Sequence, residues 1–450
     1  MPMQAITLLA IIGSIPMQTP TNAAPTLAKT IGRKVLWRLA LPTILFMLLS
    51  SLDRVNISFA ALQMNGELGF SPSQYGFGAG ILFLGFLAGQ YPAVLLLQRI
   101  GMHRWIALCA TLWSVCAAAV AFVHTPLQFY VLRVLLGFAE GGLAPGIVVY
   151  LSQFATERER ATTFALPMLA IPLSIVVGSP VSGWLMSMHM PFGLAAWRWM
   201  LIAEALPTFV LAIAAYFYFP DRPRDVRWLN GAERDWLEAH AANREDGRVR
   251  NDWRILKTPL VWVSALLWFV LLSGAYGIMF WLPQMIKQLS GLSPVQIGFV
   301  NALPWVGAMF GTYCNSKHSD RTGERFLHIS VPSIVAAAAM LAAWACGPGP
   351  AGLAMLFLAG TGLGAAQGAF WALPTSTLTP ATFAVAAVAI NIAGSSGGLV
   401  MPHLVGFVRE KSGSFAGPTI LIAAMLLIAA LLVACIRRWF FPRPILLARQ

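Results

Sequence analysis

The chain of 450 residues is 58% hydrophobic and only 10% charged, whereas an ordinary soluble domain carries about 25% charged residues. This composition excludes a water-soluble fold. Because a membrane-spanning helix takes about 20 mostly apolar residues, the chain has room for about a dozen spans but for no large soluble domain. The net charge of +13 does not indicate a nucleic-acid partner, because the basic residues lie between apolar blocks and form no patch interleaved with aromatic residues.

Apolar runs bounded by charged residues or by Pro and Gly clusters predict twelve membrane-spanning helices in two sets of six. The first set is predicted near 36–60, 76–97, 105–123, 127–150, 161–187 and 198–219. The second set is predicted near 260–284, 295–316, 326–346, 351–372, 380–408 and 418–436. Between the sets, a charged stretch contains the amphipathic run GAERDWLEAHAANRE, which indicates a soluble helical linker.

The expected fold is therefore an all-α membrane protein with twelve transmembrane helices in two six-helix bundles. Its expected parts are a disordered N-terminal segment 1–32, an N-terminal bundle 33–220, a cytoplasmic linker 221–258, a C-terminal bundle 259–437 and a cytoplasmic tail 438–450. The short apolar stretch at residues 1–15 has no positive region before it and is too short to span a membrane. We expect Met17 to be the native start.

The orientation of these spans follows from the distribution of Lys and Arg, which are retained on the cytoplasmic side in short loops. Of the 30 Lys and Arg residues, 24 fall on the side that holds both termini, and four fall on the opposite side. Both termini are therefore expected to be cytoplasmic. The high net charge then reflects topology and contact with anionic lipid headgroups.

Two loops at corresponding positions of the halves carry similar strings, QRIGMHR at 98–104 and DRTGER at 320–325. Gly101 and Gly323 allow tight turns, and Arg99 and Arg321 can interact with helix C-termini or pair across the bundle interface. Two ordinary basic turns are the alternative. The strings resemble the signature loop of the major facilitator superfamily. The second loop keeps the acid of that signature as Asp320, and the first has Gln98 in its place.

The resemblance extends over nearly the whole chain from residue 33 and is most specific for the anion:cation symporter family. Five segments carry it: LDRVNISFAALQMN, LLGFAEGGLAPG, PLSIVVGSPVSGW, YGIMFWLPQMIKQLSGLS and INIAGSSGGLVMP. They are similar to members that import tartrate, phthalate or hydroxyphenylacetate. The resemblance implies a proton-coupled symporter of small organic anions in the bacterial inner membrane, which works by alternating access. We expect it to be a monomer.

Four ionisable residues stand inside apolar spans, where a charge costs about 2.5 to 3.5 kcal/mol on insertion scales: Asp53, Arg54, Arg133 and Glu140. From the predicted span ends, Asp53 and Arg54 lie about 10 Å inside the outer end of the first span, and Arg133 about 9 Å inside that of the fourth. Glu140 follows Arg133 on the same helical face, about 10 Å deeper. We therefore expect a ladder of alternating charges.

One interpretation is that these residues form two salt bridges whose only role is to stabilise the N-terminal bundle. Buried ion pairs seldom stabilise a fold better than apolar packing does, which favours a role in transport. The family resemblance implies that Arg54 holds the substrate carboxylate, that Asp53 and Glu140 are the protonation sites, and that Arg133 pairs with these acids. Glu204, beside Arg198 near the outer end of the sixth span, is expected to be a structural partner.

The second half has no charge at mid-depth, so its part of a binding site must be polar or aromatic. Asn391 lies in the eleventh span among small residues, where the family has an Asn in the site. Gln90, Tyr276 and Trp371 are further candidates for substrate binding, although Trp residues in membrane proteins more often anchor at the interface or pack. Trp281 and Trp305 are weaker candidates of the same kind.

The chain lacks the motifs of the main alternative functions. No Lys follows a Gly, so there is no phosphate-binding GxxxxGK[ST] loop, and no His is followed by Glu, which excludes the HExxH pattern of zinc hydrolases. We expect no enzyme activity, no cofactor and no metal. Two alternatives stay open: a proton-coupled drug or metabolite exporter of the same fold, and a transporter-like membrane sensor.

Overall fold

The computed structural model describes residues 23–154, 170–188, 193–245 and 252–440. The expectations about a native start at Met17, about disorder in residues 1–22 and about the end of the tail lie outside the described residues. All regular structure in the described ranges is helical. Within these ranges, ten helices are long and apolar enough to cross a membrane, and the shorter apolar helix α9 and the more polar α13 complete a set of twelve.

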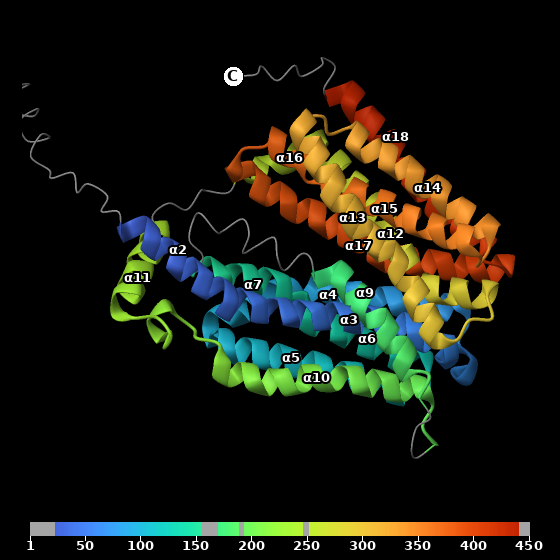
Figure 1. Cartoon of the computed structure of the whole chain (residues 1–450), viewed down its shortest axis with the longest axis horizontal. Helices are drawn as coiled ribbons and strands as arrows, with labels where there is room; N and C mark the ends of the chain where they lie inside the picture. The colour runs from blue at the N-terminus through green and yellow to red at the C-terminus, as the bar shows by residue number, and fades with distance from the viewer. Residues whose placement is uncertain (1–22, 155–169, 189–192, 246–251, 441–450) are drawn as a thin grey trace, which may run out of the picture.

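The helices form two six-helix bundles (Figure 1). The first bundle contains α3 (Leu41–Leu68), α4 (Pro72–Ile100), α5 (Met102–Ala119), α6 (Pro126–Gly141) continued by α7 (Leu143–Ser152), α9 (Ala170–Leu185) and α10 (Ala196–Tyr218). The second contains α12 (Pro259–Leu289), α13 (Pro294–Thr322), α14 (Leu327–Cys346), α15 (Pro350–Phe370) followed by the short α16 (Ala372–Thr377), α17 (Pro380–Ser412) and α18 (Ala416–Phe440). Outside the bundles, α2 (Ala23–Val35) leads into α3 through one π-helical turn, and α11 (Gly231–Glu245) lies between the bundles in sequence.

Two predicted boundaries in the first span were wrong. Residues 23–32 belong to the helix α2 and are not disordered. The helix α3 continues to Leu68 and ends where Gly69 takes a left-handed conformation with φ 67°. The prediction ended the span near residue 60 because the last turns, QMNGEL, are polar. The helix is therefore about 12 Å longer at that end than hydropathy indicates.

The second helix of each bundle begins with the same local structure. Ser71 and Ser293 each form a capping box with a Gln three residues later, and a Pro occupies the first helical turn. The serine hydroxyl accepts a hydrogen bond from the Gln backbone N–H, and the Gln side chain accepts one from the serine backbone N–H. These reciprocal bonds satisfy backbone groups that a helix start leaves free. The matching strings SPSQYGF and SPVQIGF extend the internal repeat beyond the two basic loops.

The bundles touch at one end, which we call the closed end, where α4 and α13 begin. Here α4 packs against α17, and α9 packs against α13. Gly76 and Gly80 of α4 lie against the backbone of α17, and Gly298 of α13 lies against the backbone at Ser179. Asn301 donates a hydrogen bond to the Ser179 hydroxyl, with 2.8 Å between Nδ2 and Oγ. Because only glycine lets two helix backbones approach this closely, these residues are required for the contact.

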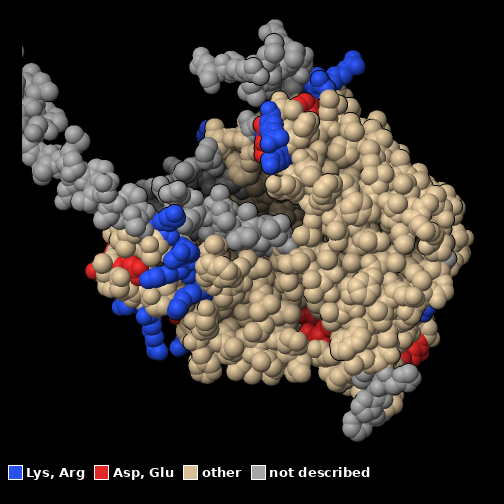
Figure 2. Space-filling model, in the orientation of Figure 1, with Lys and Arg blue, Asp and Glu red and all other residues tan. Residues whose placement is uncertain are grey.

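At the other end, which we call the open end, the bundles separate. Figure 1 shows them diverging toward α2, α11 and α16. In Figure 2 the surface is hollowed between the bundles on this side, and Lys and Arg side chains lie on both sides of its mouth. The hollow is therefore reached from the end that carries most of the positive charge.

A leucine in place of Gly298 should force the bundles apart at the closed end, because its side chain would meet the backbone at Ser179. In a cysteine-free background, spin labels on Met188 and Gly291 would report the separation of the bundles there. We expect the distance to lengthen in Gly298→Leu. Gly349→Leu is the control, since a Cβ at Gly349 meets nothing within 4 Å. Equal distances in the two variants would contradict the role of Gly298.

An ion pair joins the helix α11 to α2, the helix that leads into the first bundle. Lys34 of α2 approaches both carboxylate oxygens of Glu233, with Nζ to oxygen distances of 2.6 and 2.7 Å. Glu233 also accepts a hydrogen bond from the backbone N–H of Asn230 at 3.0 Å. The hydrogen bond from Lys34 is the largest cause that lowers the pKa of Glu233 below its ordinary value. The ionised form of Glu233 therefore stabilises the contact of α11 with α2.

Because the pKa of Glu233 is lower in the folded protein, this stabilisation is complete above the ordinary value of 4.5 and is lost as pH falls through the lowered value. We expect Glu233→Gln to increase amide hydrogen exchange in α11 at pH 7. At a pH below the lowered pKa of Glu233, amide hydrogen exchange in α11 should be equal in the variant and the unchanged protein. Equal exchange of the two proteins at pH 7 would show that the ion pair does not hold α11.

Candidate functional site

The centre of the first bundle contains one direct ion pair between α3 and α6. Arg54 donates from Nε to Oε2 of Glu140 at 3.1 Å, and Nη2 lies 3.1 Å from the same oxygen. Nη2 also lies 3.2 Å from the hydroxyl of Ser50. The side chain of Glu140 is completely buried, whereas that of Arg54 is 14% exposed. Arg54 is thus the member of the pair that a solute in the hollow can reach.

The length of α3 explains why Arg54, and not Arg133, pairs with Glu140. With α3 ending at Leu68, Arg54 lies about 21 Å from the closed end. Glu140 is equally deep on α6, which begins at Pro126. Arg133 is about 10 Å closer to the closed end. The pairing of Arg133 with Asp53 and Glu140 was implied by the family resemblance, and the first span predicted too short had placed Asp53 and Arg54 at the depth of Arg133.

Arg133 is nevertheless buried, with 1% of its surface exposed. Its Nε and Nη2 atoms have no hydrogen-bond partner in the part of the chain that the structure describes. A buried guanidinium without a partner is costly. Its charge still acts on Asp53 and Glu140 over a longer distance. Arg133 therefore contributes positive potential to the cluster without a direct bond to either acid.

Asp53 lies beside Arg54 in sequence but points into the bundle, with 1% of its surface exposed. Its Oδ1 atom accepts a hydrogen bond from Asn56 at 3.3 Å. Its Oδ2 atom has no partner among the described residues. The structure thus brings all four predicted charges into one buried cluster, in which the acids occupy different surroundings.

Aromatic side chains from both bundles line the space next to Arg54. The guanidinium of Arg54 stacks over the ring of Phe86 at 4.8 Å. Tyr276 of α12 packs against Phe83 of α4 with ring centroids 4.5 Å apart, and it lies close enough to Arg54 for an electrostatic interaction. The sequence-predicted Tyr276 is therefore part of this site.

Gln90 and Asn391 face each other across the hollow by helix register. Phe83 of α4 lies against Gly398 of α17 where the bundles still touch. Gln90 lies two helical turns after Phe83, on the same face of α4. Asn391 lies two turns before Gly398, on the same face of α17. Each amide is therefore about 10 Å nearer the open end than the contact of Phe83 with Gly398. Gln90 is half-buried and Asn391 is exposed. These amides extend the site toward the open end.

The predicted Trp residues lie elsewhere. Trp371 packs in an aromatic cluster of the second bundle, with ring centroids 5.4 Å from Trp268 and 5.3 Å from Phe370. Trp281 donates from Nε1 to the backbone oxygen of Pro402 at 3.1 Å in the bundle contact, and Trp305 is buried. Among the described residues, no hydrogen bond, ion pair or ring contact joins these three side chains to Arg54.

Glu204 does not pair with Arg198, the basic residue nearest to it in the sequence of α10. Arg198 binds Glu67, with 3.0 Å between Nη2 and Oε1, and also donates to the backbone oxygen of Ala121. Glu204 is buried and accepts a hydrogen bond from Ser182 at 2.6 Å. The ion pair at the closed end is therefore Arg198–Glu67, and Glu204 has another environment.

The two basic loops have the predicted turns. Gly101 and Gly323 have φ values of 80° and 70°, in the region that favours glycine. Arg99 and Arg321 are exposed on the surface. Asp320 pairs with Arg325, with 2.6 Å between Oδ1 and Nη1, so the acid of the second loop is bound within that loop.

In the first loop, Asp221 from the end of α10 takes the position next to the turn. It accepts a hydrogen bond from the backbone N–H of His103 at 3.3 Å, and its Oδ1 lies 2.8 Å from Nδ1 of His103. A Cβ at Gly101 would overlap its carboxylate. The sequence analysis missed this residue because it lies 118 positions away from His103.

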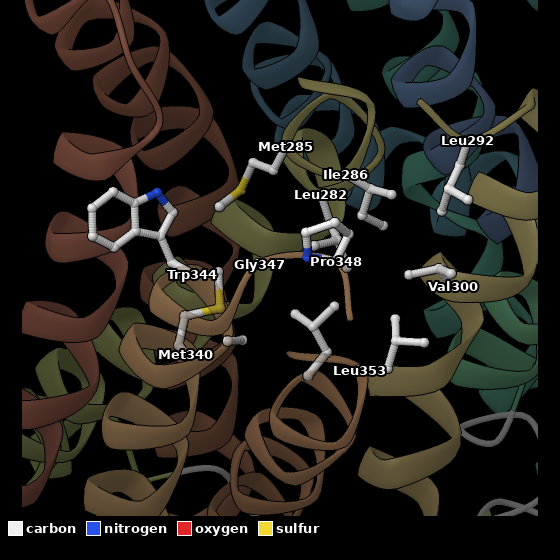
Figure 3. A pocket seen from close by; sticks show the side chains of 12 residues that line it. Leu282, Met285, Ile286, Leu292, Val300, Met340, Trp344, Gly347, Pro348 and Leu353 are labelled. Carbon is white, nitrogen blue, oxygen red and sulfur yellow. The ribbon is translucent and has the colours of Figure 1, made fainter. Parts of the chain in front are cut away.

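An apolar pocket lies apart from the charged cluster, in the second bundle near the closed end (Figure 3). Side chains of α12, α13, α14 and α15 line it, among them Met285, Val300, Trp344 and Leu353. Charged side chains are absent from its lining. It offers nothing to bind an anion, so the charged cluster is the candidate site.

Twelve helices in two repeated bundles around a central hollow are the architecture of a transporter. The sequence profile described as Major Facilitator Superfamily matches residues 43–402. The chain belongs to the major facilitator superfamily, whose members are transporters and not enzymes.

Relatives and solved structures agree with this assignment. The chain is 39% identical over 411 residues to an Agrobacterium vitis protein named "Putative tartrate transporter", with 90% of this chain and 91% of that protein covered. It is 31% identical to a "Quinolone resistance transporter" of Acinetobacter baumannii, with 90% and 94% covered. Its fold is similar to a bacterial homologue of the human lysosomal transporter Spinster in an inward-facing, occupied conformation, with a TM-score of 0.75, 17% identity, and 90% and 97% covered.

Proposed function

We propose that the protein imports a small organic anion together with protons, by alternating access of the central hollow to the two sides of the membrane. The anion is a carboxylate such as tartrate, phthalate, hydroxyphenylacetate or a sugar acid. The observation that carries this proposal is the ion pair of Arg54 and Glu140, in which only Arg54 is open to the hollow. A carboxylate that enters the hollow competes with Glu140 for the guanidinium.

This competition couples anion binding to proton binding. A guanidinium offers a planar pair of donors to a carboxylate. When the anion takes Arg54, Glu140 loses its partner in a completely buried position. An ionised carboxylate without a partner is unstable there, so Glu140 takes up a proton. The protonated acid also no longer repels the anion. Release of the anion lets Arg54 and Glu140 pair again and sets the proton free.

The remaining site residues fit a role in holding the rest of the anion. Tyr276 and Phe86 present aromatic surface next to Arg54, and Gln90 and Asn391 present amide groups farther toward the open end. Amides can bond both hydroxyl and carboxylate groups. Phe86 makes the site more apolar, which suits an aromatic or sparsely hydroxylated acid.

We further propose that the protein lies in the bacterial inner membrane as a monomer, with both termini and the open end on the cytoplasmic side. The distribution of Lys and Arg supports this orientation, because 24 of them fall on that side of the predicted spans. The monomer is supported by the fact that both walls of the hollow come from one chain. The 39% identical relative named for tartrate supports the substrate class.

Uptake into proteoliposomes tests the proposal. The purified protein is reconstituted, the outside is made more acidic than the inside, and labelled tartrate, phthalate, hydroxyphenylacetate and sugar acids are offered in turn. We expect one of these anions to accumulate and the accumulation to stop when a protonophore removes the gradient. Binding of an anion without any flux would instead favour a membrane sensor.

A second candidate function is a proton-coupled exporter of the same fold. The 31% identical quinolone resistance transporter is the observation that favours it. Energised right-side-out membrane vesicles separate the two functions. An importer accumulates the anion in these vesicles, whereas an exporter lowers the internal concentration of a preloaded drug.

A further inference from the structure

The first bundle buries a second carboxyl group that the exchange between Arg54 and Glu140 does not use. Glu204 of α10 is 5% exposed. Its Oε1 atom accepts a hydrogen bond from the hydroxyl of Ser182 on α9 at 2.6 Å. Its Oε2 atom has no hydrogen-bond partner within the described ranges. One oxygen is therefore held in place, and the other is available.

Charged groups around Glu204 are few. The helix α10 packs against α3, α5, α9 and the short helical turn Val120–Phe122. The sequences of α9 and of that turn contain no ionisable residue. On α10 itself, Arg198 is bound to Glu67, and the ionisable Tyr216 and Tyr218 lie at the far end of the helix.

On α3 and α5 the remaining ionisable groups are accounted for as well. Arg54 is bound to Glu140, and His103 at the start of α5 is bound to Asp221. The other ionisable residues of α5 are Arg104 in its first turn and the thiols of Cys109 and Cys116. Among the described residues, no cation contacts Glu204. A carboxyl group buried without a cation is stable as the neutral acid.

Glu204 is linked to Asp53. The side-chain amide of Asn56 donates to Oδ1 of Asp53 at 3.3 Å and also interacts with Glu204. Asp53 and Glu204 are close enough for their charges to interact. Asp53 repeats the pattern of Glu204, since its Oδ2 atom has no partner among the described residues. The amide of Asn56 is thus hydrogen-bonded to Asp53 and lies near Glu204, and each acid has one oxygen without a hydrogen bond among the described residues.

The two acids differ in depth. Glu204 lies eight residues after the start of α10 at Ala196, about 12 Å from the closed end, whereas Asp53 lies about 22 Å from that end. Glu204 is therefore placed between the closed end and Asp53. A proton that enters when the closed end opens reaches the depth of Glu204 before that of Asp53.

We propose that Glu204 is a third proton-carrying carboxyl group of the transport cycle, which passes to Asp53 a proton taken up from the closed end. This rests on the proposed function of proton symport. In the transfer, the O–H bond on Glu204 Oε2 breaks and an O–H bond forms on Asp53 Oδ2, so that the negative charge moves from Asp53 to Glu204. Ser182 and Asn56 position the two acids.

The first measurement is spectroscopic and needs no substrate. Infrared difference spectra of the reconstituted full chain are recorded between acidic and alkaline pH for the unchanged protein, Glu204→Gln and Glu67→Gln. We expect the carboxylic-acid C=O band of the unchanged protein to lose one component in Glu204→Gln. Glu67→Gln should keep that component, because Glu67 is 40% exposed and paired with Arg198. A spectrum of Glu204→Gln identical to that of the unchanged protein would overturn the proposal.

The second measurement is the pH profile of proton-driven tartrate uptake in proteoliposomes, with counterflow exchange recorded in parallel. We expect Glu204→Gln to move the external pH of half-maximal uptake downward by about one unit, a tenfold change in proton affinity, and to leave counterflow unchanged. Ser182→Ala removes a donor that stabilises the ionised carboxylate of Glu204, so it should move this pH in the opposite direction. An equal loss of uptake and counterflow would show a merely structural role and overturn the proposal.

The two proposals fail in different ways. If the unchanged protein does not accumulate tartrate or the other anions in response to a pH gradient, the proposed symport is wrong, and the role of Glu204 in transport is wrong with it. If the unchanged protein accumulates an anion and Glu204→Gln shows the same pH profile, only the role of Glu204 is overturned.

Discussion

Replacement of Glu140 by Gln should abolish proton-driven accumulation of the anion and preserve counterflow exchange. The Gln side chain keeps the shape of Glu140 and an oxygen that can accept the hydrogen bond from Nε of Arg54. It cannot bind and release a proton, so the uphill step loses its coupling. Accumulation driven by a pH gradient and exchange of labelled for unlabelled anion are measured on the same proteoliposomes.

Glu67→Gln is the matched control for this experiment. Glu67 lies on the same helix α3 as Arg54, but it binds Arg198 near the closed end and is 40% exposed. We expect the control to keep both accumulation and exchange. Intact accumulation in Glu140→Gln would remove Glu140 from the coupling mechanism, and loss of exchange as well would indicate that the variant disrupts the site itself.

Replacement of Arg54 by Lys should weaken anion binding by about ten- to hundredfold. The change keeps the positive charge but removes the second donor of the guanidinium. Hydrogen bonds to charged groups contribute about 1.5 to 3 kcal/mol, and each 1.4 kcal/mol corresponds to about a tenfold change in Kd. Binding of the transported anion to purified protein, measured by calorimetry, gives this ratio directly.

The control for Arg54 is Arg38→Lys. Arg38 lies in the π-helical turn before α3 and stacks on Trp228, with 5.6 Å from Cζ to the ring centroid, away from the ion pair with Glu140. We expect it to bind the anion as the unchanged protein does. Equal affinity of Arg54→Lys and the unchanged protein would show that the anion does not bind at this guanidinium.

The sequence was sufficient to predict the helices because a membrane-spanning segment is encoded locally, in about 20 consecutive apolar residues. The boundary errors occurred where helix continuation does not depend on hydropathy. The polar turns before Gly69 remain helical because their backbone bonds are internal and the left-handed Gly69 ends them. The capping boxes at Ser71 and Ser293 were readable from the sequence as a Ser-Pro-x-Gln pattern, although only the basic loops were used for the repeat.

The charged cluster could be predicted as a set of residues but not as a set of bonds. Two charged side chains can pair only when they lie at the same depth in the bundle. The predicted first span ended eight residues before the end of α3, and this error placed Arg54 at the depth of Arg133 instead of that of Glu140. Contacts between distant segments were not predictable at all. Asp221 at the first loop and Ser182 at Glu204 meet their partners only through helix packing, and a single sequence contains no signal for that packing.

Among the described residues, the ion pair beside the central hollow, Arg54 with Glu140, belongs to the first bundle, whereas the second bundle contributes the uncharged Tyr276 and Asn391. In the proposed function, the proton-binding acids thus belong to the first half of the duplicated chain, whereas both halves contact the anion. Under this proposal, substitutions on α12 or α17 could change the preferred anion during evolution without altering the proposed proton-binding residues. Such a division of labour would allow one ancestral carrier to diversify into many nutrient specificities.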